Sequence, residues 1–359
     1  MEIRRLEIRN LRCLRDVALE PAPGLNLLTG DNGVGKTSVL EALHLMAYGR
    51  SFRGRVRDGL IRSGSEAVEV FVAWQEDGGA ARRAGLRHSG QAWDGRLDGE
   101  KLSHLGELCA AFMVVTFEPG SHALVSGGGE PRRRFIDWGL FHVEQDFLDL
   151  WRRYARALKQ RNALLKAGHG GQQLDAWDHE LADAGEAVTL RREQYLARLQ
   201  ERVAAAAAEL APGLGAATLV FQPGWRREDL SLADALLLAR DRDRAIGHTS
   251  VGPQRADWRL EFATLPNREP LSRGQGKLAA LSCLLAQARD CAERRGDWPV
   301  IALDDLASEL DPTHQQRLMA ALLQTPAQLF VTGTDLPAAL SRQAAMTFHV
   351  EHGEIRLHD

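Results

Sequence analysis

The chain has 359 residues with a hydrophobic fraction of 44% and a charged fraction of 26%, which is typical of a folded protein with one large or two ordinary domains. Its formal net charge of -3 excludes a globally basic protein, so any contact with nucleic acid must come from a local patch. No apolar run reaches the roughly 18 residues of a membrane span and residues 1–9 form no signal-peptide core, so we expect a cytoplasmic protein without a membrane partner.

The first predicted elements lead into a glycine-rich loop. Residues 1–29 read as two or three strands, the last of them at 25–29, and residues 38–46 read as a helix. Between them stands G-D-N-G-V-G-K-T at 30–37, which fits the phosphate-loop pattern G-x-x-x-x-G-K-[ST] at every fixed position. Because a strand, a glycine loop and a helix are the setting that this pattern requires, we interpret the segment as a nucleotide-binding loop rather than a glycine turn with a chance lysine.

This loop predicts how a nucleotide is held. Glycines let successive backbone N–H groups turn toward phosphate oxygens, above the positive end of the helix dipole. We expect Lys36 to reach the β- and γ-phosphates and the Thr37 hydroxyl to ligate Mg²⁺. The predicted nucleotide contacts of this segment are Gly30, Asp31, Asn32, Gly33, Val34, Gly35, Lys36, Thr37 and Ser38.

A strand-rich region follows the loop helix. The turn at 49–54 carries Arg50 and Arg53, for which a solvated loop is favoured over a contact with phosphate or DNA. Apolar residues then alternate from 68 to 74, and glycine turns stand at 78–79 and 94–95, which predicts an antiparallel sheet over 67–102. A buried strand is expected at 112–117.

Basic residues and long helices characterise the middle of the chain. Three adjacent arginines follow the glycine-rich segment 126–129, and they fit phosphate contacts and a solvated helix start equally well. Residues 141–210 predict two helices, the second from about 174, packed as an antiparallel arm. Basic residues of the first helix lie opposite its apolar stripe, where a solvated face is the default interpretation. The candidate DNA contacts from both groups are Arg132, Arg133, Arg134, Arg152, Arg156 and Lys159.

A capping string stands at the start of a C-terminal helix. After a strand at 217–221, a helix at 232–244 and a strand at 258–262, the string L-S-R-G-Q at 271–275 directly precedes a helical stretch. Ser272 and Gly274 therefore lie at a helix N-terminus, where free N–H groups and the helix dipole attract an anion. A serine cap alone would not explain the whole string.

Paired acids end the next apolar strand. Residues 300–305 read V-I-A-L-D-D, and a strand buried in a parallel sheet ends at the carboxyl edge, where ligands bind. We expect Asp304 to position Mg²⁺ opposite Thr37, and Asp305 to accept a proton from, or orient, an attacking water. The strand at 328–334 ends in hydroxyl side chains that are placed to sense a γ-phosphate.

Four of these motifs, in this order, resemble a known family. They are G-D-N-G-V-G-K-T-S at 30–38, P-R-R-R-F-I-D at 131–137, L-S-R-G-Q-G-K at 271–277 and D-D-L-A-S-E-L-D at 304–311. The combination is similar to SMC-like ABC-type ATPase heads and, within that group, to the RecF family of bacterial DNA replication and repair proteins. The resemblance implies an α/β fold, an ABC-type P-loop ATPase head with an antiparallel β subdomain and an inserted α-helical lobe. We expect the head at 1–135 and 245–359, and the lobe at 136–244.

The resemblance also implies a cycle in which ATP joins two copies of the chain. In such heads the signature string of one subunit caps the nucleotide held by the phosphate loop of the other. The further nucleotide contacts that this implies are Ser272, Gly274, Gln275 and Asp311. Hydrolysis, with Lys36, Asp304 and Asp305 as catalytic residues and ATP and Mg²⁺ as cofactors, removes the contacts that favour the closed dimer.

The partners implied by the resemblance belong to recombinational repair. They are DNA, as duplex, single strand or the junction between them, together with RecR and RecO and, through them, the recombinase RecA. The resemblance implies that ATP binding and hydrolysis control the affinity of the protein for DNA.

Two positions depart from the pattern of related heads. Such heads carry a glutamine after the strand that is predicted here at 112–117, where this chain reads V-V-T; Thr116, Glu118 and water are the alternatives for that ligand. The second acid is Asp305, where many ABC-type ATPases have the longer glutamate. The shorter side chain predicts slow hydrolysis, which suits a timer better than a motor.

Two other classes of protein fit less well. The ATPase subunit of a transporter needs a membrane partner and usually a histidine after the last core strand, where this chain reads T-G-T at 332–334. The long helical insertion also argues against a transporter subunit. A structural SMC protein requires a far longer coiled coil than the arm at 141–210 supplies.

Overall fold

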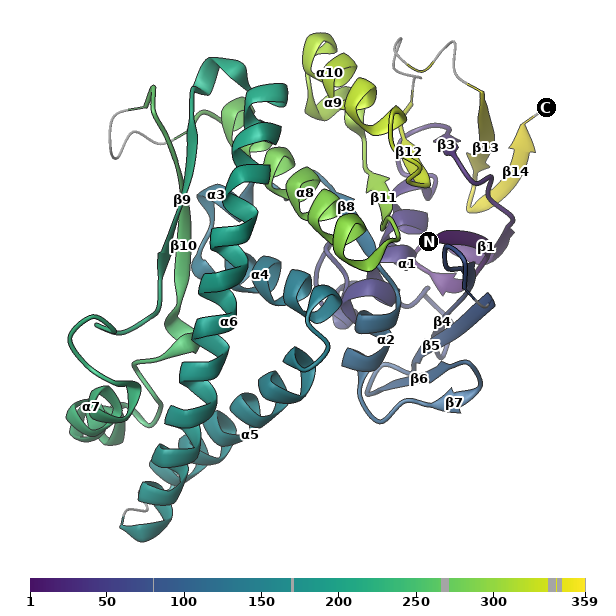
Figure 1. Cartoon of the computed structure of the whole chain (residues 1–359). Coiled ribbons are helices and arrows are strands. Elements are labelled where there is room, and N and C mark those ends of the chain that lie inside the picture. Colours follow the sequence, from purple (N-terminus) through teal and green to yellow (C-terminus); the bar gives the residue numbers. More distant parts are fainter. Residues whose placement is uncertain (80, 169–170, 266–270, 335–339, 341–343, 359) are drawn as a thin grey trace. The chain divides into compact units, whose positions relative to one another are not determined.

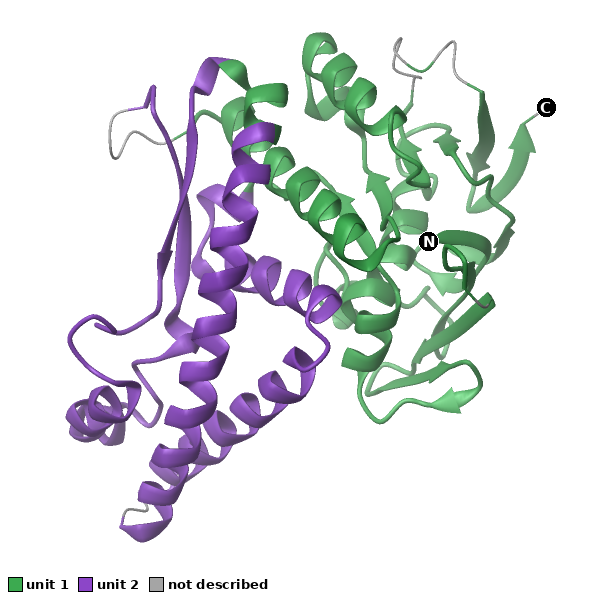
Figure 2. Cartoon of the chain, in the orientation of Figure 1, with its two compact units in different colours: residues 1–122, 206–212, 271–359 green, residues 123–205, 213–270 purple. Residues whose placement is uncertain are grey.

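The computed structural model describes residues 1–79, 81–168, 171–265, 271–334, 340 and 344–358. The chain divides into two compact units, coloured separately in Figure 2. The first, called the head, contains residues 1–122, 206–212 and 271–359, and the second, called the lobe, contains residues 123–205 and 213–270. Within the described part of the chain, no helix has the length and apolar character needed to cross a membrane.

A mixed sheet forms the centre of the head. Its strands lie in the order β14 (Glu354–His358), β13 (Ala345–Glu351), β3 (Leu25–Thr29), β12 (Leu329–Thr332), β11 (Val300–Leu303) and β8 (Val114–Phe117) (Figure 1). All neighbouring pairs are parallel except β13 with β14. β8, β11 and β12 are buried at every residue, because both faces of the sheet are covered by helices.

The helices of the head cover the two faces of this sheet. Helix α1 (Lys36–Tyr48) shares one core with Ala302, Phe330 and the antiparallel sheet described below. On the other face, Ile301 and Leu303 pack against helices α8 (Arg273–Arg295) and α10 (Pro312–Leu323). The shorter helical segments of the head are η1 (Val56–Asp58), α2 (Leu105–Ala111) and α9 (Leu306–Glu309).

The antiparallel sheet predicted over 67–102 is present and includes more of the chain. Its strands lie in the order β2 (Leu14–Leu19), β1 (Glu2–Leu11), β4 (Val68–Gln75), β5 (Ala81–His88), β6 (Trp93–Leu97) and β7 (Glu100–Lys101). Every second residue of β4 is buried, so one face packs on the core and the other faces water. The first two predicted strands of the chain therefore join this sheet, and only β3 joins the parallel one.

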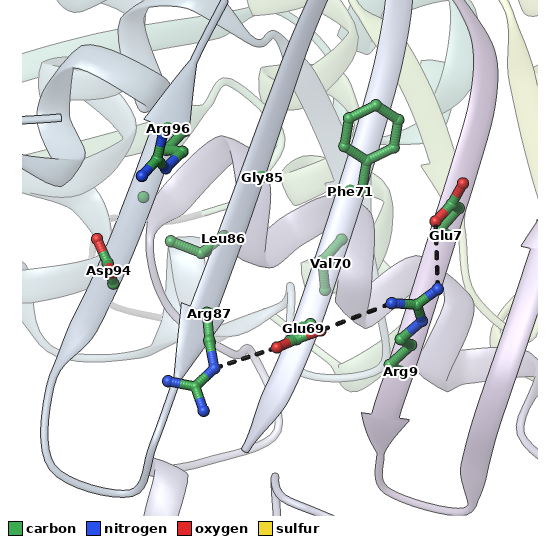
Figure 3. Close-up of a pocket in the computed structure, with 11 residues that line it drawn as sticks. Glu7, Arg9, Glu69, Val70, Phe71, Gly85, Leu86, Arg87, Asp94 and Arg96 are labelled. Atoms are coloured by element: carbon green, nitrogen blue, oxygen red, sulfur yellow. Dashed lines mark hydrogen bonds and ion pairs between the residues drawn. The ribbon is translucent and has the colours of Figure 1, made fainter. Parts of the chain in front are cut away.

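The water-exposed face of this sheet has a shallow groove of about 240 Å³, drawn in Figure 3. Phe71 on β4 pairs directly with Gly85 on β5, and an aromatic side chain opposite a glycine compensates for the missing side chain. Around this pair, Glu69 binds Arg87 at 3.1 Å and Arg9 at 4.0 Å. The groove is thus the space over a glycine within a ladder of cross-strand ion pairs.

The lobe is mostly helical. Its helices are α3 (Ala123–Ser126), α4 (Gly129–Val143), α5 (Phe147–Lys166), α6 (Gln172–Leu210) and α7 (Leu232–Ile246), with short segments η2 (Pro212–Leu214) and η3 (Pro253–Arg255). A two-stranded antiparallel ribbon is formed by β9 (Ala217–Gln222) and β10 (Asp257–Phe262). The two long helices predicted between residues 141 and 210 are confirmed as α5 and α6.

The boundaries of the lobe differ from the expected 136–244. Residues 123–135 and 245–270 belong to the lobe, because a hydrogen bond and an ion pair join α4 to β10. The indole N–H of Trp258 donates to the Arg132 carbonyl at 2.9 Å, and the Arg132 guanidinium binds Asp257 at 2.6 Å. The end of α6, residues 206–212, belongs to the head instead, where Glu209 pairs with Arg289 of α8 at 2.9 Å.

A fully buried arginine lies on the apolar face of α5. Arg161 pairs with Asp178 of α6 and with Asp243 of α7, the latter at 2.7 Å, and donates to the Thr249 hydroxyl at 2.9 Å. The charge pattern of α5 alone gave no sign of this network, because its partners come from residues that are distant in sequence. The network connects three segments of the lobe through one cation.

We expect Arg161→Ala to destabilise the protein by about 3 to 5 kcal/mol, because it leaves the fully buried Asp243 carboxylate without its cation, while Asp178 keeps Arg240 as a partner. The matched control is Arg153→Ala on the same helix, whose pair with Glu180 is exposed on both sides and contributes less than about 1 kcal/mol. Urea unfolding followed by circular dichroism measures both variants. Equal unfolding midpoints would contradict a structural role for the buried network.

Candidate nucleotide-binding site

The phosphate loop between β3 and α1 has a backbone that only glycine adopts easily. Gly30, Gly33 and Gly35 have φ values of 137°, 82° and 123°. A Cβ on Gly30 would lie 2.2 Å from the Val350 carbonyl oxygen, and a Cβ on Gly35 would lie 2.7 Å from the Leu14 side chain. The loop is therefore pressed between β13 and the residues that start β2, and its glycines are required by both conformation and space.

Lys36 is folded back over this loop. Its ammonium donates to the carbonyl oxygens of Gly30 at 2.6 Å and Asp31 at 2.7 Å. Burial lowers the pKa of Lys36, and the neighbouring carboxylates of Asp305 and Asp304 act in the opposite direction. A phosphate that enters the loop offers this partly desolvated cation a charged acceptor in place of two neutral carbonyls.

Asp304 joins the ends of three chain segments. Its Oδ1 accepts from the Thr37 hydroxyl at 2.9 Å and from the Thr332 hydroxyl at 2.8 Å. The side chain is 3% exposed, and burial raises the pKa of Asp304 while the two hydroxyl bonds oppose the shift. The residues meet because β12 lies between β3 and β11 with all three strands parallel, so their carboxyl ends share one edge.

Thr332 also fixes the backbone of Asp305. The Thr332 hydroxyl accepts from the Asp305 N–H at 2.9 Å, and Asp305 has φ 48° and ψ 46°, a conformation that is strained for a residue with a side chain. We expected the hydroxyls at the end of β12 to sense a γ-phosphate. Thr332 instead is 2% exposed and holds both acids, which is the role that its hydrogen bonds define.

The signature string occupies the N-terminus of α8. The Ser272 hydroxyl accepts from the Gln275 N–H at 3.3 Å, and the Gln275 side-chain oxygen accepts from the Ser272 N–H at 2.9 Å, which is a reciprocal capping box. Ser272 and Gly274 are exposed in the single chain, and a Cβ on Gly274 would meet nothing within 4 Å. The string is therefore open to a ligand or to another molecule.

An ion pair that the sequence analysis missed ties this helix to the segment after the acids. Lys277 of α8 lies 2.7 Å from the Glu309 carboxylate and donates to the Glu309 carbonyl at 3.2 Å. Asp311, predicted to bind nucleotide, caps α10 by accepting from the N–H groups of Thr313 at 3.0 Å and His314 at 3.2 Å. Asp311 is exposed, so its expected role toward a second subunit stays a prediction.

One of the alternatives for the missing glutamine lies beside the paired acids. Thr116 is buried and its hydroxyl lies 3.1 Å from Nδ1 of His44, which turns it away from the site. Glu118 directly follows β8 at the carboxyl edge, where the Asp304 N–H donates to the Phe117 carbonyl at 2.8 Å. Burial raises the pKa of Glu118, and the charge of Asp304 adds to the shift. Among the two side chains considered, Glu118 is the one beside the paired acids.

The predicted metal ligands fit Mg²⁺. Thr37 and Asp304 supply one hydroxyl and one carboxylate oxygen at the mouth of the phosphate loop. The described residues contain no group of three or more His, Cys, Asp and Glu that would form an all-protein metal cage. Mg²⁺ is commonly bound by one or two protein oxygens together with nucleotide phosphates and water, which is the arrangement available here.

A second network that the sequence analysis missed lies behind the loop helix. Glu41 of α1 is fully buried and accepts from Arg12 at 2.8 Å and from the Ser51 hydroxyl. Arg53 reaches the same carboxylate at 3.7 Å, so this arginine of the basic turn is paired within the head. Arg50 is exposed, in line with the solvated loop that was favoured.

The candidate DNA contacts of the lobe differ in their availability. Arg132 is 11% exposed and binds Asp257 through both Nε at 2.6 Å and Nη2 at 2.9 Å, so its position does not support the expected DNA contact. Lys159 lines the same groove as Trp151 and Leu158. It therefore lies beside the apolar stripe of α5 and not on the opposite face of the helix. Apart from half-buried Arg133 and Arg152, the remaining candidates are exposed, namely Arg134, Arg156 and Lys159.

The parallel sheet, the phosphate loop, the edge acids and the signature cap define an ABC-type ATPase head of the SMC-like kind. A family model described as "RecF/RecN/SMC N terminal domain" matches residues 2–355. The chain is 68% identical over 360 residues to "DNA replication and repair protein RecF" of Stenotrophomonas maltophilia (strain R551-3), which covers 99% of each chain. It is 65% identical to the protein of the same name from Xanthomonas oryzae pv. oryzae (strain MAFF 311018), covering 99% of this chain and 100% of that one. The chain belongs to the RecF family.

Two solved structures have the same fold. "Structure of the recombination mediator protein RecF-ATP in RecFOR pathway" superimposes with a TM-score of 0.89 at 26% identity, covering 100% of this chain and 98% of that one. An Smc head bound to the C-winged helix domain of ScpA superimposes with a TM-score of 0.61 at 15% identity, covering 100% and 97%, and is similar in fold alone. The predicted fold class is thereby confirmed.

We expect Thr332→Val to weaken Mg²⁺-dependent ATP binding roughly tenfold, because it removes hydrogen bonds to an ionised acid and to the Asp305 backbone. Binding measured in excess EDTA is expected to change little, since the phosphate loop is untouched. Thr332→Ser is the matched control and keeps the hydroxyl. Titration with a fluorescent ATP analogue measures all three proteins, and equal losses with and without Mg²⁺ would contradict this role for Thr332.

Proposed function

We propose that the chain is an ATP-dependent DNA-binding switch of recombinational repair. The observation that carries the proposal is the line of hydrogen bonds from Thr37 through Asp304 and Thr332 to Asp305 at the phosphate loop. This line joins two hydroxyls, the Asp304 carboxylate and the Asp305 backbone N–H at the phosphate loop, where the β- and γ-phosphates of ATP would lie. A similar protein solved as "RecF-ATP" supports ATP as the nucleotide.

The proposed site is completed by a second copy of the chain. Ser272 and Gly274 are exposed at the N-terminus of α8, where unpaired N–H groups and the helix dipole favour an anion. We infer that they contact the γ-phosphate of ATP bound to the partner subunit, with Gln275 and Asp311 beside them. ATP thus favours the dimer because its γ-phosphate has contacts in the closed state that are lost in the open one.

The proposed cycle follows from the chemistry of these side chains. Lys36 exchanges its carbonyl partners for the β- and γ-phosphates, and Thr37 and Asp304 hold Mg²⁺, which neutralises charge on the phosphates. Asp305 orients the attacking water, and Glu118 lies at the same edge of the sheet. Asp305 is shorter than glutamate and its backbone is strained, which favours slow hydrolysis and a long-lived dimer.

We infer that the ATP-bound dimer differs from the monomer in its affinity for DNA. Basic residues of the lobe supply phosphate contacts, and the candidates are the exposed Arg134, Arg156 and Lys159 and the half-buried Arg152. Family membership supports a place beside RecO and RecR in loading the recombinase RecA, on duplex DNA or on its junction with a single strand. Charge removal at the lobe candidates should reduce the salt dependence of DNA binding if they contact phosphates.

The first test is the molecular mass in solution with and without ATP and Mg²⁺, with duplex DNA binding followed in the same samples. We expect the wild type to become a dimer and to gain DNA affinity only with ATP. Lys36→Met and Ser272→Arg should each stay monomeric, because one removes the phosphate contact and the other blocks the signature string.

A mixture of the two variants separates contacts within one chain from contacts between chains. If the signature acts on the partner's nucleotide, a mixed dimer has one intact site, formed by the loop of Ser272→Arg and the string of Lys36→Met. We therefore expect partial recovery of ATP-induced dimers in the mixture. If neither the mass nor the DNA affinity of the wild type changes with ATP, the proposed switch is wrong.

Asp305→Asn is expected to prolong the ATP-bound dimer at least tenfold, because an amide orients and polarises the attacking water less well than a carboxylate. Phosphate release measures turnover, and mass measurements over time measure dimer lifetime. Asp241→Asn, at an exposed acid of α7 outside the nucleotide site, is the charge-matched comparison. Unchanged turnover in Asp305→Asn would rule out Asp305 as the acid that positions water.

A further inference from the structure

A second concave site lies within the lobe, between helices α4, α5 and α6. It is a groove of about 730 Å³, and the elements that form it are labelled in Figure 1. Its lining is cationic, with five basic residues and two acidic ones. The basic residues are Arg133, Arg134, Lys159, Lys166 and Arg192, and the acidic residues are Glu130 and Asp137.

Internal ion pairs use both acids of the groove. Arg192 is buried and binds Asp137 through two bonds of 2.8 Å, and Arg134 pairs with Glu130 one turn away on α4. Three basic side chains remain, namely Arg133, Lys159 and Lys166, which we call the rim cations. In the described part of the chain, none of the rim cations has a carboxylate within ion-pair distance.

Arg133 differs from both of its neighbours in sequence. Arg132 binds Asp257 and Arg134 binds Glu130, whereas the half-buried Arg133 donates to a neutral acceptor, the Ala256 carbonyl, at 2.8 Å. Burial lowers the pKa of Arg133, and the nearby charge of Arg192 adds to the shift. An anion in the groove would relieve this repulsion, because two cations lie close together in a partly desolvated place.

Aromatic and apolar side chains of α5 line one side of the groove, which we call its floor. Trp151 is half-buried there, and Phe141 holds its ring in a T-shaped contact with centroids 5.8 Å apart. Leu158 and the buried Tyr154 continue the floor along α5, and the Tyr154 hydroxyl is engaged by Gln254. An aromatic face with limited rotation beside several cations is the arrangement that proteins use to stack a nucleic-acid base.

We propose that this groove binds an unpaired nucleotide of a DNA strand, with the base against Trp151 and the adjacent phosphates on the rim cations. The inference rests on the proposed DNA binding and adds the place in the lobe where an unpaired part of the DNA is held. Bases of an intact duplex are stacked on each other, so only an unpaired base can enter a groove of this size. The phosphate contacts carry no sequence information, and the binding is therefore independent of sequence.

The hydrogen-bonding groups that line the groove favour a nucleotide over an acidic peptide. A bound peptide brings backbone N–H groups that need acceptors. Three acceptors that line the groove are engaged inside the lobe: Asp137 with Arg192, the Asn162 side-chain oxygen with Thr249 at 2.7 Å, and the Gln254 side-chain oxygen with Tyr154. A phosphodiester only accepts hydrogen bonds, and the groove offers it donors.

The test compares two DNA molecules in the presence of ATP and Mg²⁺, a blunt duplex and the same duplex with a single-stranded gap. We expect Trp151→Leu to weaken binding of the gapped DNA roughly tenfold, since one base–aromatic stack is lost, while duplex affinity changes less than about twofold. Fluorescence of 2-aminopurine placed in the gap is expected to be quenched by the wild type and to recover in the variant.

A second variant keeps the test valid if Trp151→Leu disturbs the fold. Lys159→Gln with Lys166→Gln changes two exposed rim cations and is expected to lower the salt dependence of single-strand binding by about 0.7 in log–log slope per removed charge. Arg259→Gln is the charge-matched control, since Arg259 is exposed on β10 and pairs with Glu261 outside the groove. Thermal unfolding of each variant confirms that it is folded.

The outcomes separate this inference from the proposed function. If the rim and Trp151 variants bind gapped DNA as the wild type does, the groove is not a nucleotide site, although ATP-dependent duplex binding still supports the switch. If the wild type binds neither DNA with ATP, the proposed function fails and the inference with it. If a fluorescent peptide of alternating Asp and Phe binds the groove and gapped DNA does not displace it, the groove is a protein-docking site and the inference is wrong.

Discussion

The hydrogen bonds that converge on the Asp304 carboxylate are the interaction on which the nucleotide site depends. Thr37 starts α1 directly after the phosphate loop, Thr332 ends β12 and Asp304 follows β11, so the three meet only because these strands lie side by side in the parallel sheet. The carboxylate is almost completely buried, and two hydroxyl donors stabilise its charge there. A shift of any one strand would leave a buried acid without its partners, which ties the geometry of the site to the packing of the head.

Pairing of charges decides which cations of the lobe can meet a ligand. Arg161, Arg192 and Arg132 hold carboxylates inside the lobe, and each joins segments that are far apart in sequence. Their burial is tolerated because every charge has a partner in good geometry. The rim cations have no such partner among the described residues, and they surround an apolar floor. A basic residue of this chain is therefore a candidate for binding only after its internal partners are known.

The nucleotide site lies in the head and the groove lies in the lobe. Helix α6 contains residues of both units. Helix α6 runs from Gln172 to Leu210, and its last residues are counted with the head. Within the head, Lys277 and Glu309 connect the signature helix to the segment that follows the acids. This pair links the N-terminal part of the signature helix to the segment beside Asp305 within one chain.

The sequence by itself determined the phosphate loop, the capping string, the paired acids and the two long helices of the lobe. Each of these depends on local chemistry: glycines where φ is positive, a serine cap before a helix, and apolar periodicity along α5 and α6. Tertiary structure alone decided that Thr332 donates to Asp304, that Arg132 is paired with Asp257 and that Arg161 is buried. It also decided that residues 123–135 and 245–270 belong to the lobe. The physical reason is that these features depend on partners many residues away, which no local pattern specifies.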